Sequence, residues 1–277
     1  IPKFIVGATV VSFATTLPEM LVSVFAALEG NADIAVGNAV GSVTANVGLI
    51  MCLSLICMPC LMTRRQFGFK AGLLLATIAV LFAFTRNGQL SVLQSVVILL
   101  FFVAFLAESL IAGKREQGTE ASEDRPELTA KTIVQNLFSF VLGAAAIVLG
   151  AQLLIDNGSA LAQMIGVPDS IIAATMIAIG TSLPELFTSV SAALKGKADI
   201  AIGNIVGSNI FNILFVVGTA ALITPVSFQP NFRMDTVVAI GAAVLLFLGT
   251  FRKQKLGRGI GILMLLCYTA YFAWLIL

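Results

Sequence analysis

The chain has 277 residues, of which 58 % are hydrophobic and only 11 % are charged. Soluble domains usually carry about 25 % charged residues, so this composition excludes a soluble globular protein and indicates a polytopic membrane protein. The net charge is only +2 and the chain contains no histidine. We therefore expect a lipid bilayer as its surroundings, no nucleic-acid partner and no zinc site.

Apolar runs of membrane-spanning length follow one another along the whole chain. A span requires about 20 mostly apolar residues. The single polar stretch, 113–131, is expected to be a linker between a first repeat, 1–112, and a second repeat, 132–277. In chain order the sequence predicts nine spans: 4–28, 33–60, 68–85, 91–112, 132–156, 168–194, 199–224, 235–251 and 258–277.

Basic residues are concentrated in alternate loops between these spans. Of the 16 lysines and arginines, all except Arg86 and Arg233 fall in loops or ends on one side of the membrane. The positive-inside rule makes that side cytoplasmic. We therefore expect a multi-pass protein of the cytoplasmic (inner) membrane, with the 113–131 linker in the cytoplasm and the C-terminus outside.

The sequence contains an internal repeat. Residues 1–50 return 166 positions later as residues 167–216, with roughly half of the aligned positions identical. The copies lie five spans apart, which is an odd number, so they cross the membrane in opposite directions. Inverted repeats with interrupted helices are typical of secondary transporters, which bind their substrate at the repeat interface near the bilayer midplane.

The charges of the linkers and the order of the spans agree with this inversion. "ALEGNAD" in the first copy becomes "ALKGKAD" in the second, so each linker carries the charge expected on its side of the membrane. The span 132–156 precedes the second copy, and its counterpart would lie before Ile1. We expect an all-α membrane fold of two inverted five-helix repeats, with ten helices in the parent and about nine in this chain.

A proline and a glutamate lie side by side inside two of the spans, as Pro18–Glu19 and Pro184–Glu185. Proline removes a backbone hydrogen bond from a helix, and a carboxylate at bilayer depth costs roughly 2.5–3.5 kcal/mol on insertion scales. Irregular backbone at this depth is tolerated where it lines a cavity or is buried in protein. We interpret the duplicated glutamates as the centre of a functional site at interrupted helices near the midplane.

Side chains that carry oxygen share a helix face with each glutamate. Helical spacing places Ser12, Thr15 and Thr16 on the face of Glu19. The same spacing places Thr181 and Ser182 on the face of Glu185. In the next span of each copy, polar residues recur at every fourth position: Asn38, Ser42, Asn46, Asn204, Ser208 and Asn212.

The chemistry of these groups favours a hard cation. Carboxylate, hydroxyl and amide oxygens suit Ca²⁺, Mg²⁺ or Na⁺ rather than soft metals. Two carboxylates balance one Ca²⁺ or two Na⁺, so one site could bind either ion in turn and couple their movements. Small residues at this spacing also serve close helix packing, so both interpretations stay open for "GNAVGSV" and for Thr16 taken alone.

Two motifs resemble a known family. "ATTLPE" and "GTSLPE", each followed by "GN-x-VGS-x-x-x-N", are similar to the alpha repeats of the sodium/calcium exchanger superfamily, the calcium/cation antiporters. The resemblance implies a ten-helix antiporter that moves Ca²⁺ against Na⁺ by alternating access. It also implies a cation site made by the side chains of Glu19, Glu185, Thr15, Thr16, Thr181, Ser182, Ser42, Asn46, Ser208 and Asn212 and by the backbone carbonyls of Ser12 and Ala178.

The sequence departs from the family pattern at three places. The first copy has "ATTLPE" where the family usually has GTS before the Leu-Pro-Glu, and "GSVTAN" where it has GSN. Asn212 occupies a position where several members carry aspartate. The site would then hold two carboxylates rather than three, which leaves the stoichiometry and the coupling to protons open.

Other functions remain as alternatives at this point. Within the same class, the runner-up is an H⁺/Ca²⁺ antiporter. From another class, a cation channel would require a ring of subunits and a filter loop, and inverted internal repeats argue against it. We expect no enzymatic activity and no cofactor, with Ca²⁺ and Na⁺ (or H⁺) as the ions bound, and a protein that functions as a monomer.

Overall fold

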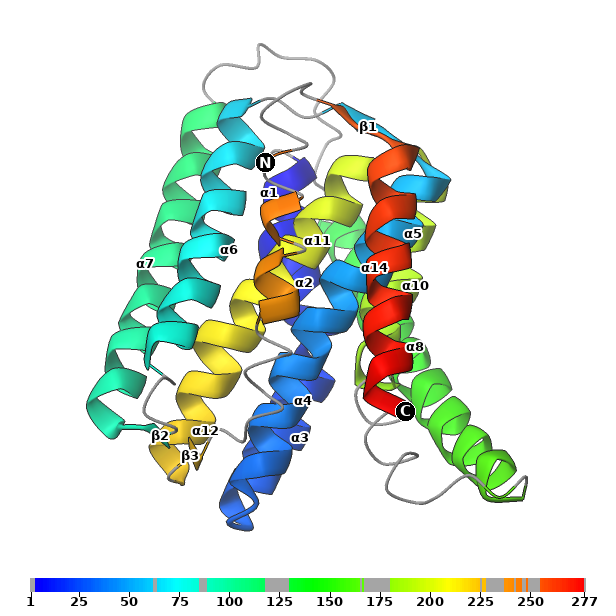
Figure 1. Cartoon of the computed structure of the whole chain (residues 1–277). Coiled ribbons are helices and arrows are strands. Elements are labelled where there is room, and N and C mark those ends of the chain that lie inside the picture. The colour runs from blue at the N-terminus through cyan, green and yellow to red at the C-terminus, as the bar shows by residue number, and fades with distance from the viewer. Residues whose placement is uncertain are drawn as a thin grey trace.

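The computed structural model of the protein consists mainly of helices, arranged as a bundle (Figure 1). Their order along the chain agrees with the predicted spans, and the prediction of an all-α membrane fold is confirmed. Of the span predicted at 235–251, the structure describes residues 237–241, 243–245 and 248, and the first part of the span predicted at 168–194, residues 168–179, lies outside the described residues. The structure describes residues 3–61, 64–84, 89–117, 130–164, 166, 180–224, 226–227, 237–241, 243–245, 248 and 255–276.

The first half of the chain contains two interrupted helices followed by two continuous ones. The interrupted helices each include a π-helical segment, in which hydrogen bonds join residues five apart. The elements are α1 (Lys3–Val6), η1 (Gly7–Val11), α2 (Ser12–Thr15), α3 (Leu17–Leu28), α4 (Ala32–Ala45), η2 (Asn46–Ile50), α5 (Met51–Cys57), β1 (Cys60–Leu61), α6 (Arg64–Phe84), β2 (Gln89–Leu90) and α7 (Val92–Gln117).

In the described part of the second half, one long helix precedes counterparts of α3, α4, η2 and α5. Its elements are α8 (Ala130–Met164), α10 (Leu183–Leu194), α11 (Ala198–Ile210), the π-helical η4 (Phe211–Val217), α12 (Gly218–Ile223), β3 (Val226–Ser227), β4 (Lys255–Leu256) and α14 (Arg258–Ile276).

Two helix ends differ from the prediction. The helix α7 runs on to Gln117, into the stretch 113–131 that was expected to be a linker, and α8 already begins at Ala130. The helix α8 also continues to Met164, although the predicted span ends at residue 156. Apolar composition reports where a helix lies in lipid, whereas the backbone hydrogen bonds continue into the polar flanks.

By length and composition, three helices among the described residues are able to cross a membrane alone: Ile34–Cys57, Val92–Ile111 and Ala198–Ile223. A fourth is added if Gly7–Thr15 and Leu17–Leu28, which meet at an angle of 52°, form one broken span. Other predicted spans contain apolar helices that are shorter within the described residues: Gly72–Phe84, Leu183–Leu194 and Arg258–Ala273.

Two short antiparallel strand pairs show that the internal symmetry extends far beyond the repeated motifs. Cys60 pairs with Leu256 at one end of the bundle, and Leu90 pairs with Val226 at the other (Figure 1). A shift of 166 positions converts each pair into the other, because residue 60 maps onto 226 and residue 90 onto 256. Each pair joins the two halves of the chain, so the repeats are interlocked.

The turns between the two helices of each repeat are also related. Gly30 and Gly196, again 166 positions apart, have φ angles of +80° and +74°. The amide N–H groups of Asn31 and Lys197 donate to carbonyls five residues back, which completes the Schellman motif that ends α3 and α10. Glycine occupies this left-handed position because it has no Cβ to clash with the backbone.

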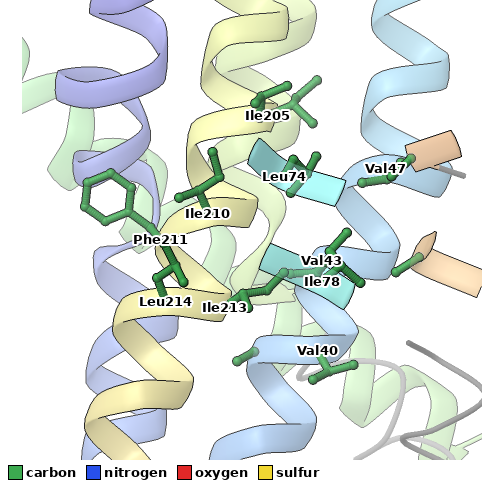
Figure 2. Close-up of a cluster of buried hydrophobic side chains, with 14 of the residues drawn as sticks. Val40, Val43, Val47, Leu74, Ile78, Ile205, Ile210, Phe211, Ile213 and Leu214 are labelled. Carbon is green, nitrogen blue, oxygen red and sulfur yellow. The ribbon is translucent and has the colours of Figure 1, made fainter. Parts of the chain in front are cut away.

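The apolar core lies where α4, α6 and α11 meet. Figure 2 shows side chains from these helices and from η4 packed against one another, including Val43 of α4, Ile78 of α6 and Ile213 of η4, all of which are fully or almost fully buried. The close approach of helices depends on glycine: a Cβ atom at Gly207 would lie 2.5 Å from the carbonyl oxygen of Ala8. Gly207 of the second copy therefore allows α11 to pack closely against the first broken helix.

Candidate cation site

The two Leu-Pro-Glu motifs produce the same break in two helices. Thr16 separates α2 from α3 with φ −83° and ψ −2°, and Ser182 precedes α10 with φ −86° and ψ 1°. Pro18 and Pro184 fall in the first turn of the helix after the break, where a missing N–H group leaves no hydrogen bond unmade. The proline therefore starts a new helix inside the span.

Each break places a glutamate in the first turn of the new helix, where the helix dipole favours a negative charge. Glu19 and Glu185 have no exposed surface. Among residues whose side chains the structure describes, they are the only charged ones that are buried. Buried charge of one sign, without a buried lysine or arginine in that described part, favours a cationic ligand.

The two carboxylates are bound across the repeat interface. The hydroxyl of Thr16 donates a 3.1 Å hydrogen bond to Oε1 of Glu185. In the repeat-related contact, the hydroxyl of Ser182 donates a 3.4 Å hydrogen bond to Oε1 of Glu19. The second oxygen of each carboxylate, Oε2, is buried without a hydrogen-bond partner. Each glutamate thus has one oxygen fixed by the opposite repeat and one oxygen available to a ligand.

A second layer of hydroxyls surrounds the carboxylates. The hydroxyl of Thr15 lies 3.4 Å from that of Ser208, and Ser42 lies 3.4 Å from Thr181 in the symmetry-related contact. These four side chains come from both repeats and are all buried. The structure therefore brings together the hydroxyls that the sequence placed on separate helices.

Two asparagines complete the group. Asn46 and Asn212 are fully buried, and neither the amide oxygen nor the amide nitrogen of either residue has a hydrogen-bond partner. Buried polar atoms without partners are rare in native proteins and call for a ligand, an ion or water. Asn209 is buried in the same way, but its repeat-related residue is Val43, so Asn46 and Asn212 are the pair that both repeats supply. Both asparagines lie in the π-helical segments η2 and η4, and such segments often occur at functional sites.

The two predicted carbonyl ligands have different outcomes. The carbonyl of Ser12 accepts a 2.9 Å hydrogen bond from the backbone N–H of Thr16 and a 3.3 Å hydrogen bond from the Thr15 hydroxyl, and the Ser12 side chain donates to Thr9. Ala178 lies outside the described residues. Of the twelve predicted ligands, the structure thus describes eleven.

Four further polar residues near the site are not among the twelve predicted ligands, although two of them, Asn38 and Asn204, belong to the predicted series of polar residues at every fourth position. Asn38 and Ser23 in the first repeat, and Asn204 and Ser189 in the second, form buried hydrogen bonds that connect the site to the helices behind it. The available signal was their identity between the two repeats. Helical spacing alone does not distinguish a residue that contacts an ion from one that lies behind it.

Comparisons with known proteins show which proteins the chain is similar to. The family model described as "Sodium/calcium exchanger protein" matches residues 1–110 and 136–277. Inner membrane protein YrbG of Escherichia coli (strain K12) is 35 % identical over 99 % of this chain and 88 % of its own length. Sodium/calcium exchanger MaX1 of Methanosarcina acetivorans is 30 % identical over 98 % of this chain and 88 % of its own length.

A solved structure agrees in the arrangement of the whole chain. The sodium-calcium exchanger NCX_Mj, soaked with 10 mM Na⁺ and zero Ca²⁺, superimposes with a TM-score of 0.85 and 28 % sequence identity, over 99 % of this chain and 87 % of that one. The inverted repeat of five helices is consistent with that fold. The extent of the family match and the shared architecture confirm the resemblance of the two motifs. The chain belongs to the sodium/calcium exchanger family of membrane antiporters.

Proposed function

We propose that the protein exchanges Ca²⁺ for Na⁺ across the cytoplasmic membrane, by binding either ion at the site between the two repeats. One observation carries the proposal: two buried carboxylates from opposite repeats each present an oxygen without a partner, beside two asparagines without partners. The identity of the similar proteins MaX1 and NCX_Mj, both named as sodium–calcium exchangers, supports the choice of ions.

The charge of the site explains why the two ions compete. Glu19 and Glu185 together carry two negative charges, which one Ca²⁺ or two Na⁺ would neutralise. A buried site is tolerated only when its charge is compensated, so it holds either Ca²⁺ or Na⁺ at a given time. Alternate opening of such a site to the two sides of the membrane converts a Na⁺ gradient into Ca²⁺ movement.

The ligands in this proposal are oxygen atoms of both repeats. The glutamates supply charge, Thr15, Thr16, Thr181 and Ser182 supply hydroxyls beside them, and a third group supplies neutral oxygens. That group comprises Ser42, Asn46, Ser208 and Asn212, together with the backbone carbonyls of Ser12 and Ala178. Oxygen ligands of this kind suit Ca²⁺, which accepts six to eight ligands in flexible geometry.

The orientation in the membrane follows from the basic loops. We place the 113–131 linker in the cytoplasm and the C-terminus outside, with the protein acting as a monomer. The description of YrbG as an inner membrane protein supports the choice of membrane.

Equilibrium competition on the purified protein in detergent tests the proposal. Ca²⁺ should raise the unfolding temperature, because a ligand that binds only the folded state stabilises it, by about 2.7 kcal/mol at a concentration of 100 Kd. Added Na⁺ at fixed pH should move the Ca²⁺ titration to higher concentrations, whereas K⁺ at the same ionic strength should not. A Ca²⁺ titration that responds to pH but not to Na⁺ would favour the H⁺/Ca²⁺ alternative and contradict the proposal.

A further inference from the structure

Two buried asparagines, Asn38 on α4 and Asn204 on α11, lie behind the site and not among its expected ligands. The side-chain nitrogen of Asn38 donates to the hydroxyl oxygen of Ser23 at 3.0 Å and to the backbone carbonyl of Glu19 at 3.1 Å. The side-chain nitrogen of Asn204 donates to the hydroxyl oxygen of Ser189 at 3.0 Å. In each repeat, the amide nitrogen is thus bound to the helix that carries that repeat's glutamate.

The oxygen of each amide faces the opposite repeat. Thr181 donates its hydroxyl hydrogen to Oδ1 of Asn38 at 3.0 Å. The hydroxyl of Thr15 has two acceptors, Oδ1 of Asn204 at 3.2 Å and the carbonyl of Ser12 at 3.3 Å, and Asn204 is the nearer of them. The sequence separations of 143 and 189 residues show that both contacts cross between the repeats. Each threonine is therefore oriented by an asparagine from the other half of the chain.

The neighbours of Asn38 determine which way its amide points. Ser23 donates its only hydroxyl hydrogen to the carbonyl of Ala35 at 2.9 Å, so its oxygen must act as the acceptor towards Asn38. The carbonyl of Glu19 is also an acceptor. Both partners require the nitrogen of Asn38, and the amide oxygen is left for Thr181.

This direction of hydrogen bonding affects the threonine oxygen. A hydroxyl group has one hydrogen and two lone pairs. When the hydrogen of Thr181 or Thr15 is donated to an asparagine, its oxygen can act only as an acceptor, towards the serine hydroxyl 3.4 Å away and towards a cation. A hydroxyl free to rotate would instead present its hydrogen to the cation in some orientations, which opposes binding.

We infer that Asn38 and Asn204 are positioning residues that act in trans, each one holding the threonine hydroxyl of the opposite repeat with its oxygen towards the cation. The inference rests on the proposed cation site. Mutation of a residue that hydrogen-bonds a metal ligand and orients it typically lowers the metal affinity by about 10–100-fold. High affinity then requires both repeats, because each asparagine belongs to the half of the chain opposite to the threonine that it binds.

Double-mutant cycles on Ca²⁺ binding, followed by thermal unfolding of the purified full chain, test this inference. Asn38→Ala and Thr181→Val should each raise the Kd for Ca²⁺ by about 10–100-fold. The Kd of the double variant should be no higher than the higher of the two single-variant values. In contrast, the fold-changes of Asn38→Ala and Thr15→Val should multiply, because residues that share no contact act independently. The repeat-related cycle, Asn204→Ala with Thr15→Val, should give the same result as the cycle of Asn38→Ala with Thr181→Val. It takes the place of that cycle if one of its variants does not fold.

Asn209→Val provides a matched control. Asn209 is a fully buried asparagine on α11 whose amide atoms have no hydrogen-bond partner, and the related position of the first repeat is already Val43. This variant should leave the Ca²⁺ affinity unchanged. If the wild-type protein binds Ca²⁺, two results would overturn the inference. One is an equal rise in the Kd for Ca²⁺ in all asparagine variants, and the other is multiplication of the fold-changes of Asn38→Ala and Thr181→Val. Absence of Ca²⁺ binding by the wild-type protein would instead overturn the proposed function and the inference with it.

Discussion

Thr16 donates its hydroxyl hydrogen to Glu185 over 3.1 Å, although the two residues are 169 positions apart in the sequence and belong to opposite repeats. Ser182 is placed in the same way beside Glu19. The two carboxylates therefore both lie at the interface between the repeats, and the hydroxyl groups of Thr16 and Ser182 that bind them belong to the other half of the chain. A change in the relative position of the repeats would alter the surroundings of both glutamates at once.

The glutamates give the first prediction. We expect Glu19→Gln and Glu185→Gln each to lower Ca²⁺ transport by more than about 100-fold, beyond the loss typical of residues that only support a metal ligand. Glutamine keeps the size and one oxygen but removes the charge that a hard cation requires. The measurement is the uptake of radiolabelled Ca²⁺ by membrane vesicles with a fixed Na⁺ gradient.

Folding is the necessary control for these two variants. Each should be obtained from membranes in the amount and with the elution profile of the wild-type protein, because removing one of two buried like charges does not break a salt bridge. Near-normal Ca²⁺ uptake by either variant would refute its role as a central ligand.

The second prediction separates stability from function. Asn46→Leu and Asn212→Leu should raise the unfolding temperature in the absence of Ca²⁺ and Na⁺, because a buried polar group without a partner costs about 1–3 kcal/mol. The same variants should lose Ca²⁺ uptake, since leucine supplies no oxygen. A lower unfolding temperature of both variants without ions would show that the amides of Asn46 and Asn212 stabilise the fold and are not held for an ion.

The third prediction concerns the contact between α11 and the first broken helix. Gly207→Ala should destabilise the protein by about 1–3 kcal/mol, the usual cost of overpacking, because the new methyl group would meet the backbone of Ala8 and the side chain of Ser12. Gly143→Ala on α8, where nothing lies within 4 Å, should leave the unfolding temperature unchanged or slightly higher. Equal unfolding temperatures for the two variants would show that this close approach is absent.

The fourth prediction tests the inversion of the repeats. Asn31 and Lys197 are exposed residues at the same position of the two related turns. In a variant without native cysteines, Asn31→Cys should react with a membrane-impermeant thiol reagent in intact cells, and Lys197→Cys only after the cells are opened. Labelling of both positions under the same condition would mean that the two copies are not inverted.

Much of this architecture is encoded in local patterns that the sequence shows directly. Proline beside glutamate in an apolar span predicts the break at Thr16, and an odd number of spans between the copies predicts their inversion. The duplication of Glu19 as Glu185 indicates which polar residues matter. Each of these signals depends on composition or on neighbours within one helix.

The pairing between repeats could not be predicted in the same way. Helical periodicity places Thr16 on the face of Glu19, yet its hydroxyl binds Glu185, because the hydrogen bond depends on how two distant helices meet. The π-helical segments at Asn46 and Asn212 were also not foreseen. A shift of backbone hydrogen bonds by one residue is determined by the packing around the helix, and the sequence of these segments does not differ visibly from that of the α-helices beside them.

The most direct test of the account is Ca²⁺ uptake by proteoliposomes that contain only this protein, with a Na⁺ gradient, a proton gradient or neither. The account predicts that an outward Na⁺ gradient at equal pH drives Ca²⁺ uptake, that a pH gradient alone does not, and that Glu19→Gln abolishes the uptake. Ca²⁺ uptake driven by the pH gradient and indifferent to Na⁺ would contradict Na⁺/Ca²⁺ exchange at this site.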